Sequence, residues 1–337
     1  MADKGTIAHG GALAAAVQKY GGKKADWLDL STGINPVSAP LPTLDPYVWQ
    51  ALPDADLMEN CLGSARHYYA FTERASLVAA PGVQALIQRL PLLRPGKTAA
   101  IIGPTYGEYA HVFQTLGSGS RVVHQIDDLL DESVVIIVNP NNPDGRIVPP
   151  EVLVKLATAL WKKGGLLIVD EAFADLMPEV SVAAHAGMRG LLVLKSFGKF
   201  FGLAGVRLGF AAGHGDDINI LNQHLGPWAV SGPALIIGAE CLGNTQLRSR
   251  ITQSVVEFAA QQRILLEQLG LKIVADTGLF QLVETSDAGD LYEALAKQHI
   301  LARVFAKQPH WLRLGLCKNS TERARLAFAL SGVLSKP

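Results

Sequence analysis

Cysteine is scarce in this sequence, and charge of either sign is in no excess. Cys61, Cys241 and Cys317 are far apart and form no CxxC pair, so we expect buried thiols in a reducing cytoplasm rather than a disulfide framework. None of the nine histidines belongs to an HExxH motif. We therefore expect no metal site.

The 30 basic and 30 acidic side chains balance, which favours neither nucleic acid nor an anionic membrane as a partner. No apolar run is long enough to span a bilayer, and the first six residues do not resemble a secretion signal. These observations predict a cytoplasmic globular protein. A length of 337 residues favours two domains over one.

One glycine-dotted segment, residues 196–209, carries the strongest chemical signal. It follows an apolar run, residues 191–194, that is typical of a buried strand. A lysine shielded from water, such as Lys199, loses its proton readily and can form a Schiff base with an aldehyde. Ser196 and Arg207 can donate hydrogen bonds to a phosphate. The segment therefore predicts pyridoxal 5′-phosphate (PLP) as cofactor, the alternative being a solvated lysine in an ordinary turn.

Apolar runs alternate with helical patterns through the first two thirds of the chain. The expected strands are residues 77–80, 98–102, 121–125, 134–138, 166–169 and 191–194. Such alternation predicts parallel strands, and ligands bind beyond the carboxyl ends of parallel strands. Asn142, Asp170 and Lys199 each follow such an end, so we expect them on one side of the sheet. A helix over 233–268 and strands at 272–275, 279–283, 300–304 and 311–316 predict a smaller α+β domain.

Four further stretches carry a family resemblance: residues 8–11, 28–36, 139–143 and 227–231. Together with residues 196–209, they resemble the fold-type I PLP enzymes of the aspartate aminotransferase superfamily. The similarity is to the histidinol-phosphate aminotransferase subgroup, and in particular to the decarboxylases of L-threonine O-3-phosphate in cobalamin biosynthesis.

The resemblance covers essentially the whole chain and implies an α/β fold and a homodimer. It implies a PLP-transferase-like large domain at 49–230 with a mostly parallel seven-stranded sheet. The small α+β domain would cover 231–337. Residues 1–48 would pack with the small domain and the active site.

The resemblance also assigns roles in cofactor binding. Lys199 would form the Schiff base and move protons, and Asp170 would pair with the pyridine nitrogen. Asn142 would donate to the phenolic oxygen, and Tyr106 would stack on the ring. Taken singly, Asp170 would ordinarily fit a helix N-cap, but its position at a strand end favours the cofactor role. Simple turn chemistry explains Asn142 equally well, and Tyr106 also fits a half-buried tyrosine at a helix start.

The resemblance places the cofactor phosphate in a cup at a strand-to-helix turn, formed by Gly82, Val83, Gln84, Ser196 and Arg207. Two positions depart from the family pattern. Phe173, beside the ring, stands where many relatives have a tyrosine that reaches the phenolic oxygen. Leu52 stands where many have a tyrosine that reaches the neighbouring subunit's phosphate.

A phosphorylated amino acid is the substrate that the resemblance implies. Arg313 would bind the carboxylate, while Arg303 and His9 would bind the second anion. Alone, Arg303 fits a solvated strand residue and His9 an exposed residue near the terminus. The remaining substrate-binding candidates are Gly10, Gly33, Asn35 and Asn142.

Decarboxylation of L-threonine O-3-phosphate is the activity that we expect first. An aminotransferase of the histidinol-phosphate type is the alternative, followed by a catalytically silent binding protein, which would not need the Lys199–Asp170 pair. A dehydrogenase is disfavoured because residues 117–120, Gly-Ser-Gly-Ser, lack the full dinucleotide-binding fingerprint.

Overall fold

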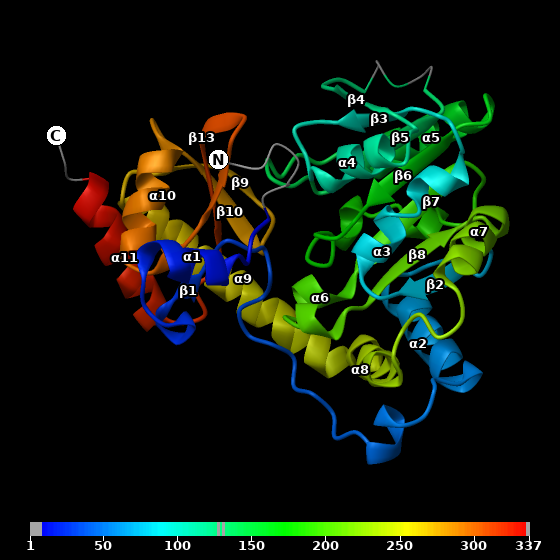
Figure 1. Ribbon diagram of the computed structural model, residues 1–337, viewed down its shortest axis with the longest axis horizontal. Helices are drawn as coiled ribbons and strands as arrows, with labels where there is room; N and C mark the ends of the chain where they lie inside the picture. Colours follow the sequence, from blue (N-terminus) through cyan, green and yellow to red (C-terminus); the bar gives the residue numbers. More distant parts are fainter. Residues whose placement is uncertain (1–8, 127–128, 130–131, 335–337) are drawn as a thin grey trace. The chain divides into compact units, whose positions relative to one another are not determined.

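The computed structural model describes residues 9–126, 129 and 132–334. The chain forms a large unit, residues 39–142 and 146–250, and a small unit, residues 1–38, 143–145 and 251–337. The sequence, by comparison, placed the domain limits after residues 48 and 230. In Figure 1 the large unit carries the sheet that begins with β2, and the small unit carries the sheet that contains β13.

A seven-stranded sheet organises the large unit. Its strands, in spatial order, are β2 (Ser76–Ala80), β8 (Gly209–Gly213), β7 (Leu191–Ser196), β6 (Leu166–Asp170), β5 (Val134–Val138), β3 (Ala99–Ile102) and β4 (Ser120–Val123). β8 runs antiparallel to β2 and β7, and all other neighbouring strands of the sheet are parallel. The expected mostly parallel, seven-stranded α/β sheet is therefore confirmed. The sequence did not predict β8, because its Gly-Phe-Ala-Ala-Gly composition has low strand propensity.

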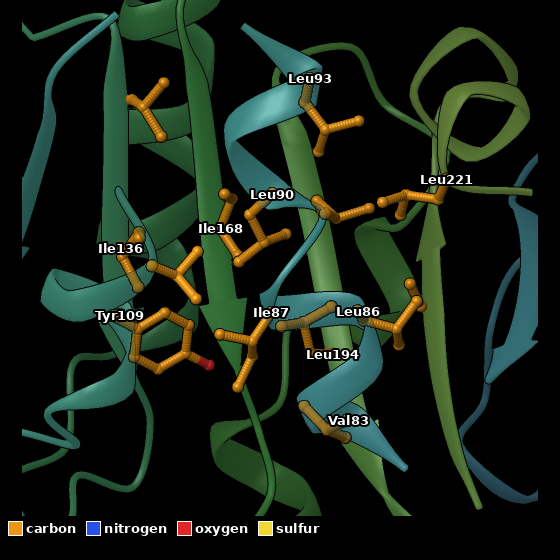
Figure 2. Close-up of a cluster of buried hydrophobic side chains, with 14 of the residues drawn as sticks. Val83, Leu86, Ile87, Leu90, Leu93, Tyr109, Ile136, Ile168, Leu194 and Leu221 are labelled. Carbon is orange, nitrogen blue, oxygen red and sulfur yellow. The ribbon is translucent and has the colours of Figure 1, made fainter. Parts of the chain in front are cut away.

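Helices α3 (Val83–Ile87), α4 (Glu108–Thr115) and α7 (Gly215–Leu225) cover one face of this sheet. Alternate strand residues such as Val134, Ile136 and Val138 belong to the shared core, as the two-residue period of a strand requires. Figure 2 shows the helix side chains from Val83 to Leu93 packed over the strand residues, with Tyr109 at one end of the cluster.

Other helices of the large unit are α2 (Ala55–Tyr68), α5 (Pro150–Trp161), α6 (Phe197–Phe200) and α8 (Gly232–Gly243). Two helical stretches are interrupted. Helix α3 ends at Ile87, and Pro91, which has no N–H to donate, lies in a separate 3-10 turn. The helix expected over 233–268 breaks at Asn244, whose side chain accepts from the Leu247 N–H and caps α9 (Thr245–Gln268).

The small unit contains an antiparallel sheet in the order β12 (Arg303–Phe305), β13 (Gln308–Gly315), β10 (Phe280–Glu284) and β9 (Lys272–Asp276). One face packs on α10 (Ala288–Lys297), α11 (Ser320–Leu334) and the later part of α9. The small unit also includes α1 (Leu13–Tyr20). The smaller α+β domain is therefore confirmed in type.

The strand expected over residues 300–304 is divided between two sheets. β11 (Ile300–Leu301) pairs with β1 (Leu28–Asp29) in parallel, whereas β12 joins the four-stranded sheet. Ala302, between them, is 2% exposed and packs in the core. The chain thus leaves one sheet and enters another at the buried Ala302. The continuous apolar pattern of the sequence does not reveal this division. Across the described ranges, no helix has both the length and the apolar character to cross a membrane.

Candidate functional site

The carboxyl ends of three neighbouring strands bring the first group of candidate residues together. Val138, Asp170 and Leu194 are in register across β5, β6 and β7. Asn142 follows the end of β5, Asp170 ends β6, and Lys199 lies in α6 directly after β7 (Figure 1). The expected convergence of the three segments on one edge of the sheet is therefore confirmed.

Asp170 is 4% exposed and is held through both carboxylate oxygens. The hydroxyl of Tyr109 donates to Oδ2 over 2.6 Å, and the Ala172 N–H donates to Oδ1 over 2.9 Å. A buried carboxylate fixed in this way can face a cation or an N–H group at the edge of the sheet. No sequence pattern links Tyr109 to Asp170, because the two residues are 61 positions apart in the chain.

Lys199 lies against an apolar surface. Its Nζ is 4.1 Å from the centroid of the Phe173 ring, three residues after Asp170 in the chain. Phe173 is buried and has no hydroxyl to donate, so the aromatic ring offers Lys199 a face but no hydrogen bond. Lys199 and the loop after β6 therefore meet at the same place.

The turn before α3 and the segment after α6 approach each other closely. Gly82 has φ +80°, and a Cβ built there would stand 2.5 Å from Arg207 Nη2. A Cβ on Gly209, which pairs with Ser196, would stand 2.6 Å from the Val83 nitrogen. These contacts leave no room for side chains. They place a guanidinium and a serine beside first-turn N–H groups, which are the donors that bind phosphate in proteins.

Gln84 and Tyr106 belong to one polar network. Gln84 Nε2 donates to Glu108 Oε2 over 2.6 Å, and the hydroxyl of Tyr106 donates to Gln84 Oε1 over 3.2 Å. Burial raises the pKa of Tyr106 to about 12, assisted by Glu108 and Asp170 and opposed by Arg207. Tyr106 therefore lies within electrostatic reach of both Asp170 and Arg207. The sequence did not single out Glu108.

The turn that contains Asn142 is fixed by its neighbour Asn141. Thr105 Oγ1 donates to Asn141 Oδ1 over 2.6 Å, and Asn141 Nδ2 donates to the Pro104 carbonyl over 2.8 Å. This ties the loop after β5 to the loop that carries Tyr106. Asn142 itself is half-buried.

In the small unit, Arg303 and Arg313 lie directly opposite each other on β12 and β13. Leu312 and Leu314 point into the core, so both arginines project from the other face. Arg313 is 6% exposed, its guanidinium lies 5.0 Å from the Phe280 ring, and its Nη2 donates to the Ser31 carbonyl. Burial, and then the charge of Arg303, lower the pKa of Arg313 to about 10. Burial also lowers the pKa of Arg303.

The segment before α1 packs on the same part of the small unit. A Cβ on Gly10 would stand 2.4 Å from the Ser31 carbonyl oxygen, the same atom that accepts from Arg313, and the Gly11 N–H donates to Ser31 Oγ. His9 is exposed and, with Ser31 and Arg303, lines a cavity of about 560 Å³. Ser31 thus contacts Gly10 and Arg313 and lines one cavity with His9 and Arg303, although the sequence assigned it no role.

Gly33 and Asn35 are buried in the turn after β1. Asn35 Oδ1 accepts from the Val37 N–H over 3.0 Å, so its side chain shapes this turn. Each unit therefore has its own group of candidates: most of the cofactor candidates gather in the large unit, and most of the substrate candidates in the small unit. Within the residues that the structure describes, no group of histidine, cysteine, aspartate and glutamate has the arrangement of a metal site.

Two curated relatives match nearly the full chain. The chain is 45% identical to a threonine-phosphate decarboxylase from Sinorhizobium sp over 329 residues, 96% of this chain and 98% of that one. It is 40% identical to a threonine-phosphate decarboxylase from Pseudomonas aeruginosa over 331 residues, 97% and 98% of the two chains. Histidinol-phosphate aminotransferases match over less of the chain, for example one from Escherichia coli O81, 30% identical over 68% of each.

Solved structures share the fold at low identity. A histidinol-phosphate aminotransferase from Sinorhizobium meliloti, solved with PLP, has a TM-score of 0.81 at 18% identity, with 98% of this chain and 95% of that one covered. The L-threonine-O-3-phosphate decarboxylase from Porphyromonas gingivalis has a TM-score of 0.74 at 16% identity, covering 92% and 100%. The family model for aminotransferase class I and II matches residues 49–330, and the chain belongs to this family.

Proposed function

We propose that this chain is a PLP-dependent lyase of cobalamin biosynthesis that decarboxylates L-threonine O-3-phosphate to (R)-1-amino-2-propanol O-2-phosphate. The observation that carries this proposal is the 45% and 40% identity to two threonine-phosphate decarboxylases over 96% and 97% of the chain. Similarity to the aminotransferase named above is lower, 30%, and covers 68% of the chain.

The residues of the large unit fit PLP. Its phosphate would bind where four residues approach one another closely: Gly82, Val83, Ser196 and Arg207. Lys199 would bind its aldehyde carbon, and the ring would lie among Tyr106, Asn142, Asp170 and Phe173. The cofactor, when bound, supplies an electron sink for a bond broken at Cα of an amino acid.

Asp170 would hold a proton on the ring nitrogen. An anion at hydrogen-bond distance favours the protonated form of its partner, and Tyr109 and the Ala172 N–H keep the Asp170 carboxylate in place. Asn142 would donate to the phenolic oxygen. Phe173 cannot do so, since it carries no hydroxyl.

Arg303 and Arg313 support a substrate with two anionic groups. Two cations directly opposite each other on neighbouring strands repel, and burial adds to the cost of both charges. A substrate that carries a carboxylate and a phosphate relieves this repulsion. We assign the carboxylate to Arg313 and the phosphate to Arg303 and His9, with Gly10, Gly33 and Asn35 shaping the surrounding backbone.

The reaction breaks the bond between Cα and the carboxylate carbon, and carbon dioxide leaves without the bonding electrons. Those electrons remain at Cα, which then takes up one proton. Lys199 Nζ is the group to which we assign delivery of that proton. The amine and the phosphate ester of the substrate remain intact in the product.

The test is to incubate the protein with PLP and L-threonine O-3-phosphate and to measure carbon dioxide with and without an added keto acid. We expect release of one carbon dioxide per substrate, independent of the keto acid. Product formation that requires the keto acid and releases no gas would instead indicate an aminotransferase.

We also propose a cytoplasmic homodimer. Four large apolar side chains between residues 41 and 52 are 62% to 70% exposed, an unusual concentration on a monomer's surface: Leu41, Tyr47, Trp49 and Leu52. The three cysteines are buried and free, which is compatible with a reducing compartment. Sedimentation equilibrium of the wild type and of Trp49→Ser tests the dimer. A wild-type protein that sediments as a monomer at micromolar concentration would contradict it.

A further inference from the structure

A buried ion pair lies on the loop after β6 and on β7, beside the residues assigned to the cofactor. Lys195 Nζ is 2.5 Å from Glu171 Oε2, and the two side chains are 4% and 0% exposed. Ser181 Oγ lies 3.2 Å from Lys195 Nζ and also donates to Glu171. The charge of Lys195 is therefore balanced locally by Glu171.

Asp175, on the same loop, has a different environment. The hydroxyl of Tyr68 donates to its Oδ1 over 3.0 Å. Its Oδ2 is shielded from solvent and has no hydrogen-bond partner within the described part of the chain. Burial raises the pKa of Asp175 to about 6, and the charges of Lys195 and Lys199 oppose this rise. Of these two lysines, Lys195 is already paired with Glu171.

The other groups around Asp175 come from α2 and α9. Asp175 raises the pKa of both Tyr68 and Tyr69, although burial is the larger cause for each. The Arg248 guanidinium lies 4.7 Å from the Tyr68 ring and lowers the pKa of Tyr68. The charge of Arg248 therefore affects Tyr68, and the Tyr68 hydroxyl donates a hydrogen bond to the Asp175 carboxylate.

We propose that the Asp175 carboxylate, held by the hydroxyl of Tyr68, is the counter-charge that keeps the nitrogen of Lys199 protonated. Asp175 is thus a positioning residue that acts through Lys199. The inference rests on Lys199 being the lysine that binds the cofactor, as proposed above.

The neighbouring residues explain why Lys199 needs such a counter-charge. Phe173 gives its nitrogen an apolar face, and an apolar environment disfavours a protonated nitrogen. Asp170 is engaged by Tyr109 and Ala172, and Glu171 by Lys195. Asp175 is two residues after Phe173, and its hydrogen-bond donor Tyr68 stacks on Phe200, the residue after Lys199, with ring centroids 6.4 Å apart. The Asp175 carboxylate, whose Oδ2 is shielded, therefore lies beside α6, the helix that carries Lys199.

The test is a pH titration of the visible absorbance of the cofactor-loaded protein, which reports protonation at Lys199 and does not depend on turnover. We expect the midpoint of the titration in Asp175→Asn to lie about one pH unit below that of the wild type. A nearby opposite charge raises the pKa of a protonated nitrogen by about this amount. Asp175→Glu restores the charge and should return the midpoint toward the wild type. Below about pH 6, where Asp175 itself takes up a proton, the wild-type and Asn spectra should converge.

Tyr68→Phe provides a second variant if Asp175→Asn does not fold. It removes the hydrogen bond that favours the carboxylate form, so its midpoint should move in the same direction by a smaller amount. Asp217→Asn is the matched control, since Asp217 is a buried carboxylate of the large unit that pairs with Arg94. Its midpoint should equal that of the wild type.

Unchanged midpoints in folded, cofactor-loaded Asp175→Asn or Tyr68→Phe would overturn the proposal. A shift of equal size in Asp217→Asn would also overturn it, because the effect would then be general. Lys199→Ala distinguishes this inference from the assignment on which it rests, that Lys199 is the lysine that binds the cofactor. If that variant keeps the visible band, the assignment of Lys199 fails; if it loses the band while Asp175→Asn shows no shift, only the counter-charge fails.

Discussion

The hydroxyl of Tyr109 donates a 2.6 Å hydrogen bond to Oδ2 of Asp170, and both side chains are buried. Asp170 ends the central strand β6, and Tyr109 belongs to α4, which covers one face of the sheet. The helix therefore fixes the rotamer of the carboxylate that faces the proposed ring nitrogen. Burial, together with Asp170, keeps the pKa of Tyr109 well above its usual range, so its hydroxyl remains a donor at all working pH values.

Tyr109→Phe should weaken PLP binding. The change removes one of the two donors that hold Asp170, and hydrogen bonds to charged groups contribute about 1.5–3 kcal/mol. We expect the dissociation constant for PLP to rise about tenfold, equivalent to ~1.4 kcal/mol. Fluorescence or absorbance titration of the apoprotein with PLP measures it.

Tyr69→Phe is the matched control for that experiment. The Tyr69 hydroxyl is buried, and among the described residues it has no hydrogen-bond partner. Its removal should leave PLP binding unchanged and leave the free energy of unfolding equal or higher. Equal losses of PLP affinity in both tyrosine variants would contradict a specific role for the Tyr109–Asp170 bond.

Lys199 and Lys195, four residues apart, should respond differently to substitution. Lys199→Ala should abolish the visible absorbance of bound PLP, since no amine would remain to bind the aldehyde. Lys195→Arg should retain the band, because arginine preserves the charge that pairs with Glu171. Absorbance spectra of the two purified variants after addition of PLP decide between the lysines. A band that disappears in Lys195→Arg and persists in Lys199→Ala would reverse the assignment.

Arg303→Gln should stabilise the apoprotein while it weakens substrate binding. Removing one of two like charges across a strand pair relieves up to about 1 kcal/mol, which corresponds to a rise in Tm on the order of 1–3 °C. L-threonine O-3-phosphate should raise the Tm of the wild type more than that of the variant. Differential scanning calorimetry measures both effects.

Lys272→Gln serves as the comparison for Arg303→Gln. Lys272 is an exposed cation of the same sheet that lies opposite Glu284 and pairs with it. Its loss removes an attraction rather than a repulsion, so Tm should stay constant or fall slightly, with substrate protection intact. A lower Tm in Arg303→Gln than in Lys272→Gln would argue against repulsion between the two arginines.

The stability of the apoprotein should depend on the protonation of Asp175. Burial raises the pKa of Asp175 in the folded state to about 6, above the ordinary value for an aspartate, so the folded protein binds this proton more tightly than the unfolded chain. The associated stability is fully present below about pH 4 and is lost as pH rises through about 6. At pH 7.5, Asp175→Asn should therefore be more stable than the wild type by about 1–3 kcal/mol.

Urea unfolding of the apoprotein at pH 4 and at pH 7.5 measures this difference. The advantage of Asp175→Asn should shrink toward zero at the lower pH, where the wild-type carboxyl is already neutral. An advantage of the same size at both pH values would indicate a packing effect in place of the titration.

The sequence anticipated those parts of the molecule that depend on local patterns. Runs of β-branched and aliphatic residues marked six strands of the large sheet, and the order of strands and helices predicted their parallel arrangement. Because parallel strands end at the same edge of a sheet, the sequence also predicted that the residues after three strand ends converge. The sequence did not predict β8, because two of its five residues are glycines, and one of them, Gly209, allows a close approach to Val83 that no local pattern reveals.

Contacts between residues far apart in the chain could not be predicted from one sequence. Tyr109 and Asp170 are 61 positions apart, and Tyr68 and Asp175 are 107 apart. Ser31 accepts from Arg313 through its backbone carbonyl, an atom that every residue possesses, so its identity gave no signal. The roles assigned to the site residues came from a family resemblance, whereas the residues that hold them in place appear only in the folded chain.

The most direct measurement of the central claim follows the carboxylate carbon itself. L-Threonine O-3-phosphate labelled with carbon-13 at the carboxylate is incubated with the PLP-loaded protein, and the label is located by NMR. We predict that the label appears as carbon dioxide and bicarbonate in an amount equal to the aminopropanol phosphate formed, and that Lys199→Ala releases none. Label that remains in an organic acid while the amino group is lost would contradict the account.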